Sequence, residues 1–242
     1  MSKNTQVLID SLPEGKLSES NYKLVESPMP EASEGEILVK TIAFAITAGT
    51  RAGLQGSASY AGAPQTGIVM NSLGVGEVIA GDNASFPVGM KVQARTGWQS
   101  YSVHKASELT AIPEGIDPLH YLGPLGINGL TAYFGLLDVG QPKTGETVMV
   151  SAAAGSVGHM VGQIAKLKEC NVVGVCGTDV KCEKLKSNLG FDTAINYKEA
   201  NFRQTLKEST PNGVDVYFDN TGGMILGSAL FRMNTGGRIA CC

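Results

Sequence analysis

Short apolar runs separated by glycine, proline and serine characterise the chain up to about residue 124. The clearest are residues 37–44, 76–80 and 91–94, and runs of this length bounded by turn-forming residues are typical of β-strands. Residues 52–67 are rich in glycine, alanine and serine and have neither a helical nor a strand period, so we expect a functional loop there. Residues 1–124 are therefore predicted to form a mainly β domain.

After residue 125 short apolar strands alternate with helical segments. The predicted strands are residues 147–151, 171–176, 193–196, 214–218 and 238–241. The helices between them are predicted over residues 155–168, up to residue 189, over residues 202–208 and after residue 218. Apolar strands between helices are typical of a parallel sheet covered on both faces. We therefore predict an α/β protein in which residues 125–242 adopt the doubly wound nucleotide-binding fold.

Composition and charge narrow the class of protein. The 242 residues suffice for two domains, and 43% hydrophobic with 17% charged residues is ordinary for a globular chain. The net charge is −3 and the basic residues are scattered, which argues against a nucleic-acid partner. The longest apolar stretches are too short for a membrane span or a signal-peptide core. Five cysteines without C-x-x-C spacing favour reduced thiols, so we expect a cytoplasmic protein without a membrane partner.

Glycine is abundant, with 31 residues, and its most informative cluster follows the strand predicted at residues 147–151. Residues 152–158 read AAAGSVG, which fits the dinucleotide fingerprint with Ala153 at its first glycine position. In that motif Gly155 and Gly158 allow close approach of backbone, and the N–H groups around Ser156 and Val157 face a pyrophosphate. The alternative is that these small residues only allow a helix to pack closely on the sheet.

The end of the second strand bears on the choice between NAD and NADP. Asp179 lies just beyond it, where a carboxylate would accept the ribose 2′-hydroxyl of NAD, or would cap the following helix. Lys181 falls in the first turn of that helix and can reach a 2′-phosphate as a point charge. We favour NADP(H), and the alternative for Lys181 is a solvated lysine on a helix face.

Several longer segments carry the pattern of one family. They read GLTAYFGLL from Gly129, GETVMV from Gly145, NYK from Asn196 and YFDNTGG from Tyr217. Together with the AAAG turn these segments resemble the prostaglandin reductases, also called leukotriene B4 12-hydroxydehydrogenases or 15-oxoprostaglandin 13-reductases. That branch consists of zinc-independent medium-chain dehydrogenases/reductases. The resemblance is dense from about residue 120 and looser before it.

The resemblance implies a GroES-like β domain, a Rossmann domain, and a cleft that holds NADPH and a hydrophobic enone. It implies that residues 155–158 lie at the pyrophosphate, that Lys181 and Tyr197 lie near the adenosine 2′-phosphate, and that Asn220 lies beside the cofactor. The alternatives are a half-buried strand aromatic for Tyr197 and a turn residue for Asn220. Arg51 matches an arginine of the family's substrate-side motif, although residues 47–50 depart from that motif.

The implied reaction is reduction of the carbon–carbon double bond of an α,β-unsaturated ketone or aldehyde by hydride transfer. The resulting enolate would be stabilised by donors and protonated, and we name no catalytic residue. We expect no metal site, because His104, His120 and His159 are widely spaced and lack companion ligands. Two alternatives stay open, namely a quinone reductase of the same superfamily and a non-catalytic nucleotide-binding form.

The last residues suggest an incomplete second domain. The doubly wound fold has six strands, and only five are predicted here, so we expect a Rossmann domain truncated after its fifth strand with an unpaired edge. A homodimer is expected for a full-length protein. We interpret Cys241 and Cys242 as small strand-end residues, with a redox pair as the alternative.

Overall fold

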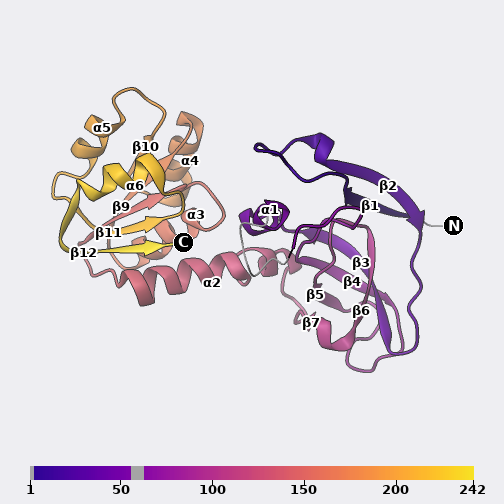
Figure 1. The fold of residues 1–242 in the computed structure, drawn as a ribbon. Helices are drawn as coiled ribbons and strands as arrows, with labels where there is room; N and C mark the ends of the chain where they lie inside the picture. The colour runs from indigo at the N-terminus through magenta and orange to yellow at the C-terminus, as the bar shows by residue number, and fades with distance from the viewer. Residues whose placement is uncertain (1–2, 56–62) are drawn as a thin grey trace. The chain divides into compact units, whose positions relative to one another are not determined.

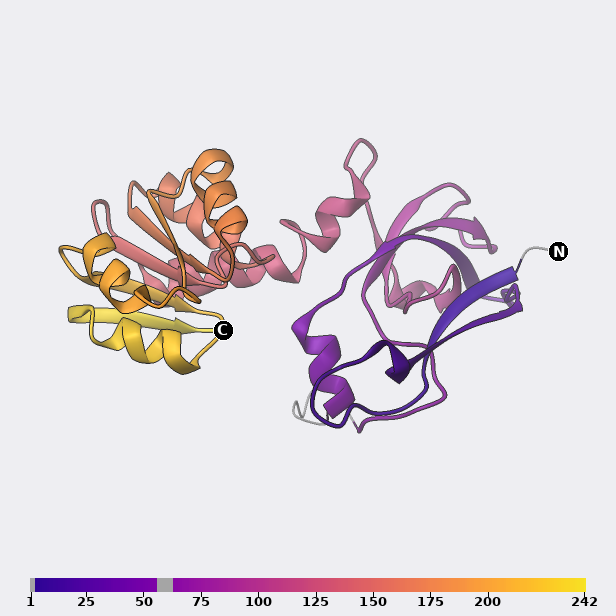
Figure 2. The ribbon, with the colours of Figure 1, turned by 90° about the horizontal axis from the view of Figure 1, so that it is seen from above.

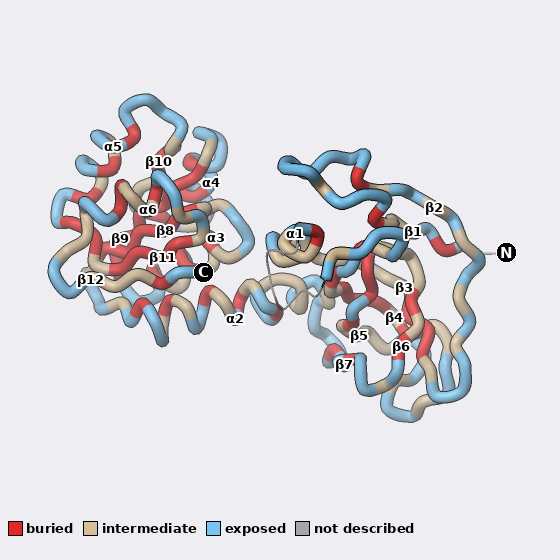
Figure 3. The backbone as a smooth tube through the Cα atoms, viewed as in Figure 1, coloured by how far each residue is buried: buried red, intermediate tan, exposed pale blue. Residues whose placement is uncertain are grey.

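The computed structural model describes residues 3–55 and 63–242, which divide into two compact units, Met1–Leu122 and Gly123–Cys242 (Figure 1). Each unit has its own sheet and its own buried core, and the buried residues gather in the strands of each unit (Figure 3). No helix in the described ranges is long and apolar enough to cross a lipid bilayer.

The first unit is built on an antiparallel sheet with the strand order β6-β3-β4-β5-β7. The strands are β3 (Glu36–Phe44), β4 (Gly74–Ala80), β5 (Lys91–Ala94), β6 (Tyr101–Lys105) and β7 (Thr110–Ala111), with a separate hairpin of β1 (Lys3–Ile9) and β2 (Tyr22–Pro28). Short 3-10 turns are η1 (Glu19–Asn21), η3 (Ala106–Glu108) and η4 (Pro118–Leu122). The core includes Ile37, Val39, Val78 and Val92, all fully buried. The strands predicted at residues 37–44, 76–80 and 91–94 are confirmed.

The predicted loop over residues 52–67 is wrong at its beginning. Residues 52–55 are the end of helix α1 (Ala48–Gln55), while residues 56–62 lie outside the described ranges. The helix starts after Thr47, whose hydroxyl accepts a hydrogen bond from the Thr50 N–H at 3.3 Å, as an N-cap does. Leu54 is buried against Ile9 and Met70, and this tertiary contact outweighs the weak local pattern.

The only tryptophan of the sequence, Trp98, packs in the first unit. Its ring stacks on Tyr22 at a centroid distance of 5.3 Å and on Phe44 at 5.5 Å. The contact joins hairpin strand β2 to strand β3 of the main sheet. Trp98 fluorescence is therefore a reporter of the first unit.

The second unit is a parallel sheet with the order β10-β9-β8-β11-β12. Its strands are β8 (Thr147–Ser151), β9 (Asn171–Cys176), β10 (Thr193–Asn196), β11 (Val214–Asp219) and β12 (Met233–Cys241). Its helices are α2 (Ile127–Phe134), continued by the π-helical η5 (Gly135–Gly140), then α3 (Gly158–Leu167), α4 (Asp179–Leu189), α5 (Phe202–Ser209) and α6 (Gly223–Leu230). The predicted α/β fold with five parallel strands is confirmed.

Helices cover both faces of this sheet (Figure 2). On one face, residues of α2, α3 and α4 such as Ala132, Val161 and Leu185 share a core with β8. On the other face, Leu206 of α5 and Ile225 of α6 pack against the sheet. Strand β8 is buried along its whole length, which explains the apolar run Val148–Val150 at its centre.

Two predicted boundaries in this unit are wrong. Helix α3 begins at Gly158 and not at residue 155, because residues 152–157 form tight turns closed by a 2.8 Å hydrogen bond from the Gly155 N–H to the Ala152 carbonyl. Strand β12 begins at Met233, five residues before the predicted start at 238. Its pairing with β11 contains a register shift between Val214 and Val216, and the glycines within it conceal a strand pattern.

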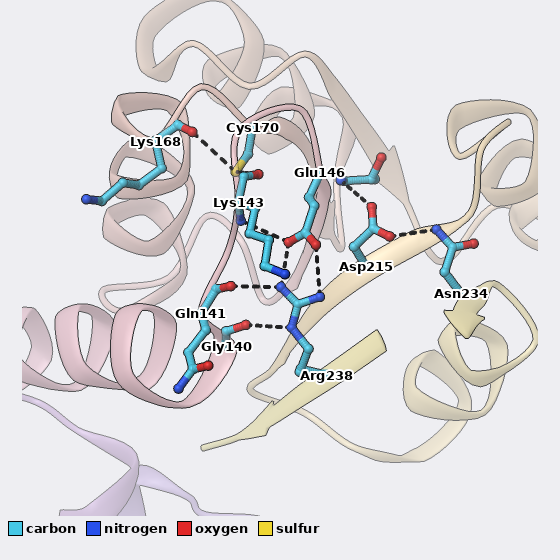
Figure 4. Close-up of polar contacts among 10 residues, drawn as sticks. Gly140, Gln141, Lys143, Glu146, Lys168, Cys170, Asp215, Asn234 and Arg238 are labelled. Carbon is cyan, nitrogen blue, oxygen red and sulfur yellow. Dashed lines mark hydrogen bonds and ion pairs between the residues drawn. The ribbon is translucent and has the colours of Figure 1, made fainter. Parts of the chain in front are cut away.

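Arg238 links β12, an edge strand of the sheet, to the rest of the unit through hydrogen bonds (Figure 4). Its guanidinium donates two hydrogen bonds to the Glu146 carboxylate, one of them at 3.1 Å, and others to the Gly140 carbonyl at 3.0 Å and the Gln141 carbonyl at 2.8 Å. The hydrogen bonds to Arg238 contribute most to holding the pKa of Glu146 below its ordinary value, and Glu146 in turn raises the pKa of Arg238. The pair is half-buried and bidentate, so it is of the stronger kind of ion pair.

Candidate functional site

A pocket of about 470 Å³ lies at the carboxyl ends of four strands of the second unit. Its walls come from the turn after β8, the β9–α4 connection, the residues after β10, and the β11–α6 connection. The lining residues are Ala152, Ala154, Gly155, Cys176, Gly177, Thr178, Lys181, Tyr197, Lys198, Thr221, Gly222, Met224 and Ile225. In open α/β sheets ligands bind at this edge, so the pocket is the candidate site.

The turn between β8 and α3 forms one wall. Ala152 adopts a left-handed conformation with φ of 45°, and His159 Nδ1 donates a hydrogen bond of 2.7 Å to the Gly155 carbonyl. A Cβ on Gly158 would lie 2.5 Å from the Ala152 carbonyl oxygen, so only glycine allows the helix to start this close to the turn. Within the described ranges the N–H groups of Ser156 and Val157 donate to no protein acceptor. Unpaired N–H groups at a helix start attract an anion.

The β9–α4 connection forms the next wall. Thr178 is the N-cap of α4, because it has extended backbone and its hydroxyl accepts a hydrogen bond from the Lys181 N–H at 3.3 Å. Asp179 is therefore not the cap, contrary to one alternative from the sequence. Its carboxylate instead accepts a hydrogen bond of 3.0 Å from the Asn196 side chain, and it does not line the pocket.

Two lysines and a tyrosine converge on this wall. A Cβ on Gly177 would lie 3.2 Å from the Tyr197 ring and 3.4 Å from Lys198 Cε, so both side chains lie over Gly177. Lys181 approaches from the first turn of α4. Among the residues that the structure describes, no carboxylate lies within 4.0 Å of the Lys181 or Lys198 ammonium. Two unpaired cations beside one pocket are suited to an anionic group such as a phosphate.

Lys198 was not among the site residues expected from the sequence. Lysines at surfaces are common, and a single lysine after a strand carries no pattern of its own. The available signal was its position next to Tyr197, at the carboxyl end of the strand beside β9. Gly155, Lys181 and Tyr197 were expected at the site and all line the pocket. Ser156 and Val157 belong to the adjoining turn and Gly158 begins α3, and these three residues do not line the pocket.

Asn220 lies at the end of β11, but its side chain is directed toward β8. Its amide donates a hydrogen bond of 2.8 Å to the Ser151 carbonyl, and its backbone N–H donates one of 2.8 Å to the Ser151 hydroxyl. Thr221 and Gly222, and not Asn220, line the pocket. In this structure Asn220 links the end of β11 to the end of β8, the central strand of the sheet.

A buried carboxylate that the sequence did not reveal organises the same turn. One oxygen of Asp219 accepts hydrogen bonds from the Tyr217 hydroxyl at 2.8 Å, the Ser151 hydroxyl at 3.2 Å, and the N–H groups of Thr221 at 3.0 Å and Gly222 at 2.8 Å. Burial alone would raise the pKa of Asp219, but these donors together lower it, while burial raises the pKa of Tyr217. Asp219 is therefore a fixed anion that shapes the turn.

Arg51, the expected substrate-side residue, belongs to the other unit. It lies in α1 and donates a hydrogen bond of 3.3 Å to the Gly15 carbonyl. All the residues that line the pocket belong to the second unit. Within residues 3–55 and 63–242 there is no group of three or more His, Cys, Asp or Glu side chains that could hold a metal ion.

Comparisons with known proteins agree with this fold. Residues 5–112 match a family model described as the N-terminal domain of oxidoreductase, and residues 156–242 match one described as zinc-binding dehydrogenase. A crystal structure titled CurA in complex with NADPH, from Vibrio vulnificus, superposes with a TM-score of 0.92 at 39% identity, over 97% of this chain and 70% of that one. The fold and site thus define an oxidoreductase of the medium-chain dehydrogenase/reductase class.

Sequence relatives narrow the class further. Mouse prostaglandin reductase 1 is 42% identical over 234 residues, 95% of this chain and 69% of the relative. The NADPH-dependent curcumin reductase of Escherichia coli K12 is 36% identical over 241 residues, 99% of this chain and 70% of the relative. The chain belongs to the zinc-independent branch of this superfamily that contains the prostaglandin reductases, and the resemblance found from the sequence is confirmed.

Proposed function

We propose that this chain is an NADPH-dependent reductase of the carbon–carbon double bond in α,β-unsaturated ketones and aldehydes. The observation that carries the proposal is the pair of unpaired lysines, Lys181 and Lys198, in a pocket that begins at the glycine turn of a doubly wound sheet. Such a pocket offers one place for a pyrophosphate and a second place for a further phosphate. NADP(H) differs from NAD(H) by that second group.

The residues present fit NADP(H). The free N–H groups of Ser156 and Val157 would receive the pyrophosphate, and Lys181, Lys198 and Tyr197 would hold the 2′-phosphate. When bound, NADPH supplies the hydride. Asp179 does not line the pocket, and its carboxylate accepts a hydrogen bond from the Asn196 side chain.

Support for the substrate class comes from the relatives. One is named a prostaglandin reductase and another a curcumin reductase, and curcumin contains double bonds conjugated to carbonyl groups. Reduction of such a bond places a hydride on the β-carbon and a proton on the α-carbon. In this proposal Asp219 and Asn220 keep the β11–α6 turn rigid beside the cofactor, and Arg51 acts on the substrate side.

The cofactor part is tested by calorimetric titration of the Lys181→Ala and Lys198→Ala variants with NADPH and NADH. Loss of one charge-assisted contact costs about 1.5 kcal/mol or more, so each variant should bind NADPH roughly ten-fold more weakly and NADH unchanged. Lys184→Ala is the matched control, because Lys184 is an exposed lysine of the same helix that does not line the pocket. Equal losses for both cofactors would refute the assignment of the 2′-phosphate.

The substrate part is tested by following NADPH oxidation with a conjugated enone, its saturated ketone and a quinone. We expect turnover of the enone, with product analysis showing the saturated ketone and not an allylic alcohol. Turnover of the quinone alone would replace the proposal by a quinone reductase. A parallel assay follows NAD reduction with saturated alcohols, and activity in that assay alone would overturn the proposal.

A further inference from the structure

Two cysteines face each other at the edge of the pocket. Cys176 is the last residue of β9, and Cys182 lies in α4, the helix that follows (Figure 1). Their sulfur atoms are 3.3 Å apart, and the side chains are buried, with exposures of 4% and 7%. A disulfide needs an S–S distance of about 2.05 Å, so a closing movement of little more than 1 Å would join them.

The two cysteines flank a segment of the chain that lines the candidate cofactor pocket. Cys176 itself lines the pocket, and so do Gly177, Thr178 and Lys181 from the segment between the two cysteines. The Thr178 hydroxyl holds the Lys181 backbone within this segment. A cross-link between Cys176 and Cys182 would therefore close a small ring that contains Lys181, one of the residues proposed to hold the 2′-phosphate.

We propose that Cys176 and Cys182 form a reversible disulfide that weakens NADPH binding, with a hydroperoxide as the oxidant. This inference rests on the proposed function for its effect on the cofactor. The Cys176 thiolate attacks the peroxide, so an S–O bond forms, the O–O bond breaks, and the departing oxygen leaves as water or alcohol after taking up a proton. The Cys182 sulfur then attacks the sulfur of the Cys176 sulfenic acid, so the S–S bond forms, the S–O bond breaks, and the hydroxyl group leaves as water with the proton of the Cys182 thiol. Two thiols are oxidised and one peroxide is reduced.

The two thiols have different roles because their surroundings differ. Cys176 lines the pocket and Cys182 does not, so Cys176 lies on the side from which a small oxidant would approach. Burial first, and then the neighbouring Cys176, raise the pKa of Cys182, which disfavours Cys182 as the thiol that makes the first attack. Cys170, also buried, is directed elsewhere, with its thiol 3.4 Å from the Lys143 carbonyl oxygen.

The cross-link is tested by peroxide treatment of a Cys241→Ser/Cys242→Ser variant, which removes the two exposed thiols. Trypsin cleaves after Lys181, so Cys176 and Cys182 fall on separate peptides that a non-reducing digest would show joined. We expect that joined pair, its release by dithiothreitol, and its absence after the further change Cys182→Ser. Cys170→Ser should still form the link. Oxidation of Cys176 to sulfinic acid without any link would overturn the proposal.

The effect on the cofactor is measured on the same samples. Coupled sites change each other's affinity equally, so if oxidation weakens NADPH binding about five-fold or more, NADPH should favour the reduced pair to the same extent. Equal affinities of the oxidised and reduced forms would refute the regulatory role. If the link forms but the reduced protein does not bind NADPH, the proposed function fails and the disulfide stands. If the reduced protein binds NADPH and no link forms, this inference alone fails.

Discussion

Replacing Gly162 by alanine should destabilise the second unit. Gly162 lies in the buried face of α3, and a Cβ there would lie 1.9 Å from Cζ of Phe191 and 2.4 Å from Cε2. Ordinary contact begins near 3.5 Å, so the ring or the helix must shift by more than 1 Å. The ring has no free space, because Phe191 is buried and a Cβ on Gly174, at another part of the ring, would lie 2.9 Å from Cδ1.

The size of the effect follows from two opposing terms. Alanine favours a helix over glycine by about 1 kcal/mol, while overpacking a core costs about 1–3 kcal/mol and occasionally more. With so short a contact we expect a net loss of about 1–2 kcal/mol in the free energy of unfolding of this unit. Gly227→Ala is the matched control, because Gly227 is in α6 and a Cβ there meets nothing within 4 Å. That variant should be as stable as the wild type or up to about 1 kcal/mol more stable.

Urea unfolding followed by two probes separates the units. Far-UV circular dichroism reports mainly the second unit, which holds all α-helices of the described ranges except α1, while Trp98 fluorescence reports the first. Gly162→Ala should lower the dichroism midpoint and leave the fluorescence midpoint in place. Adding Phe191→Leu should recover part of the loss, since the clashing ring atoms are removed. A Gly162→Ala protein as stable as Gly227→Ala would refute the steric reasoning.

Three further outcomes are expected. Arg238→Ala should cost about 1–3 kcal/mol and speed hydrogen exchange in β12, because the buried part of the Glu146 carboxylate loses its partner, and Arg238→Lys should recover only part of this. Glu146→Gln should be less stable than the wild type at neutral pH, and the difference in the free energy of unfolding should shrink as the pH falls below 4.5. The reason is that a carboxylate whose pKa is lowered by folding stabilises the folded protein only at a pH above its ordinary pKa. A difference that stays constant when urea unfolding is repeated at decreasing pH would contradict this. Tyr217→Phe should cost about 0.5–1.5 kcal/mol while the other donors keep Asp219 in place, and loss of NADPH binding in that variant would show that the network does more than shape the turn.

Burial explains which elements could be predicted from the sequence. Strand β8 is buried throughout, so its composition alone marks it as a strand. The β1–β2 hairpin was missed because β2 is largely solvated and even Leu24 is 70% exposed, which removes the alternating pattern. Helix α1 was missed because its stability depends on the contact of Leu54 with Ile9, a residue 45 positions earlier.

The residues of the candidate site also include some that the sequence predicted and some that it did not. Gly155, Lys181 and Tyr197 each lie within five residues of the end of a predicted strand, so the topology of a parallel sheet brings them to one edge. The carboxylate of Asp219 with the Ser151 hydroxyl depends on a contact between residues 68 positions apart. Contacts of that kind need the strand order and register, which a local pattern does not contain.

The strand order of the second unit has a consequence for folding, because one neighbour of β8 is distant from it in the chain. Strand β8 pairs with β9, which follows it closely in the chain, but its other neighbour is β11, with Val148 beside Val216. As the chain is synthesised, β8, β9 and β10 can associate while the second edge of β8 still waits for β11. Pairing across so long a separation is slow, because the intervening chain must first be brought together. The Ser151 hydroxyl, buried at that open edge, finds its partners only when β11 arrives, so the turn beside the candidate site is completed late.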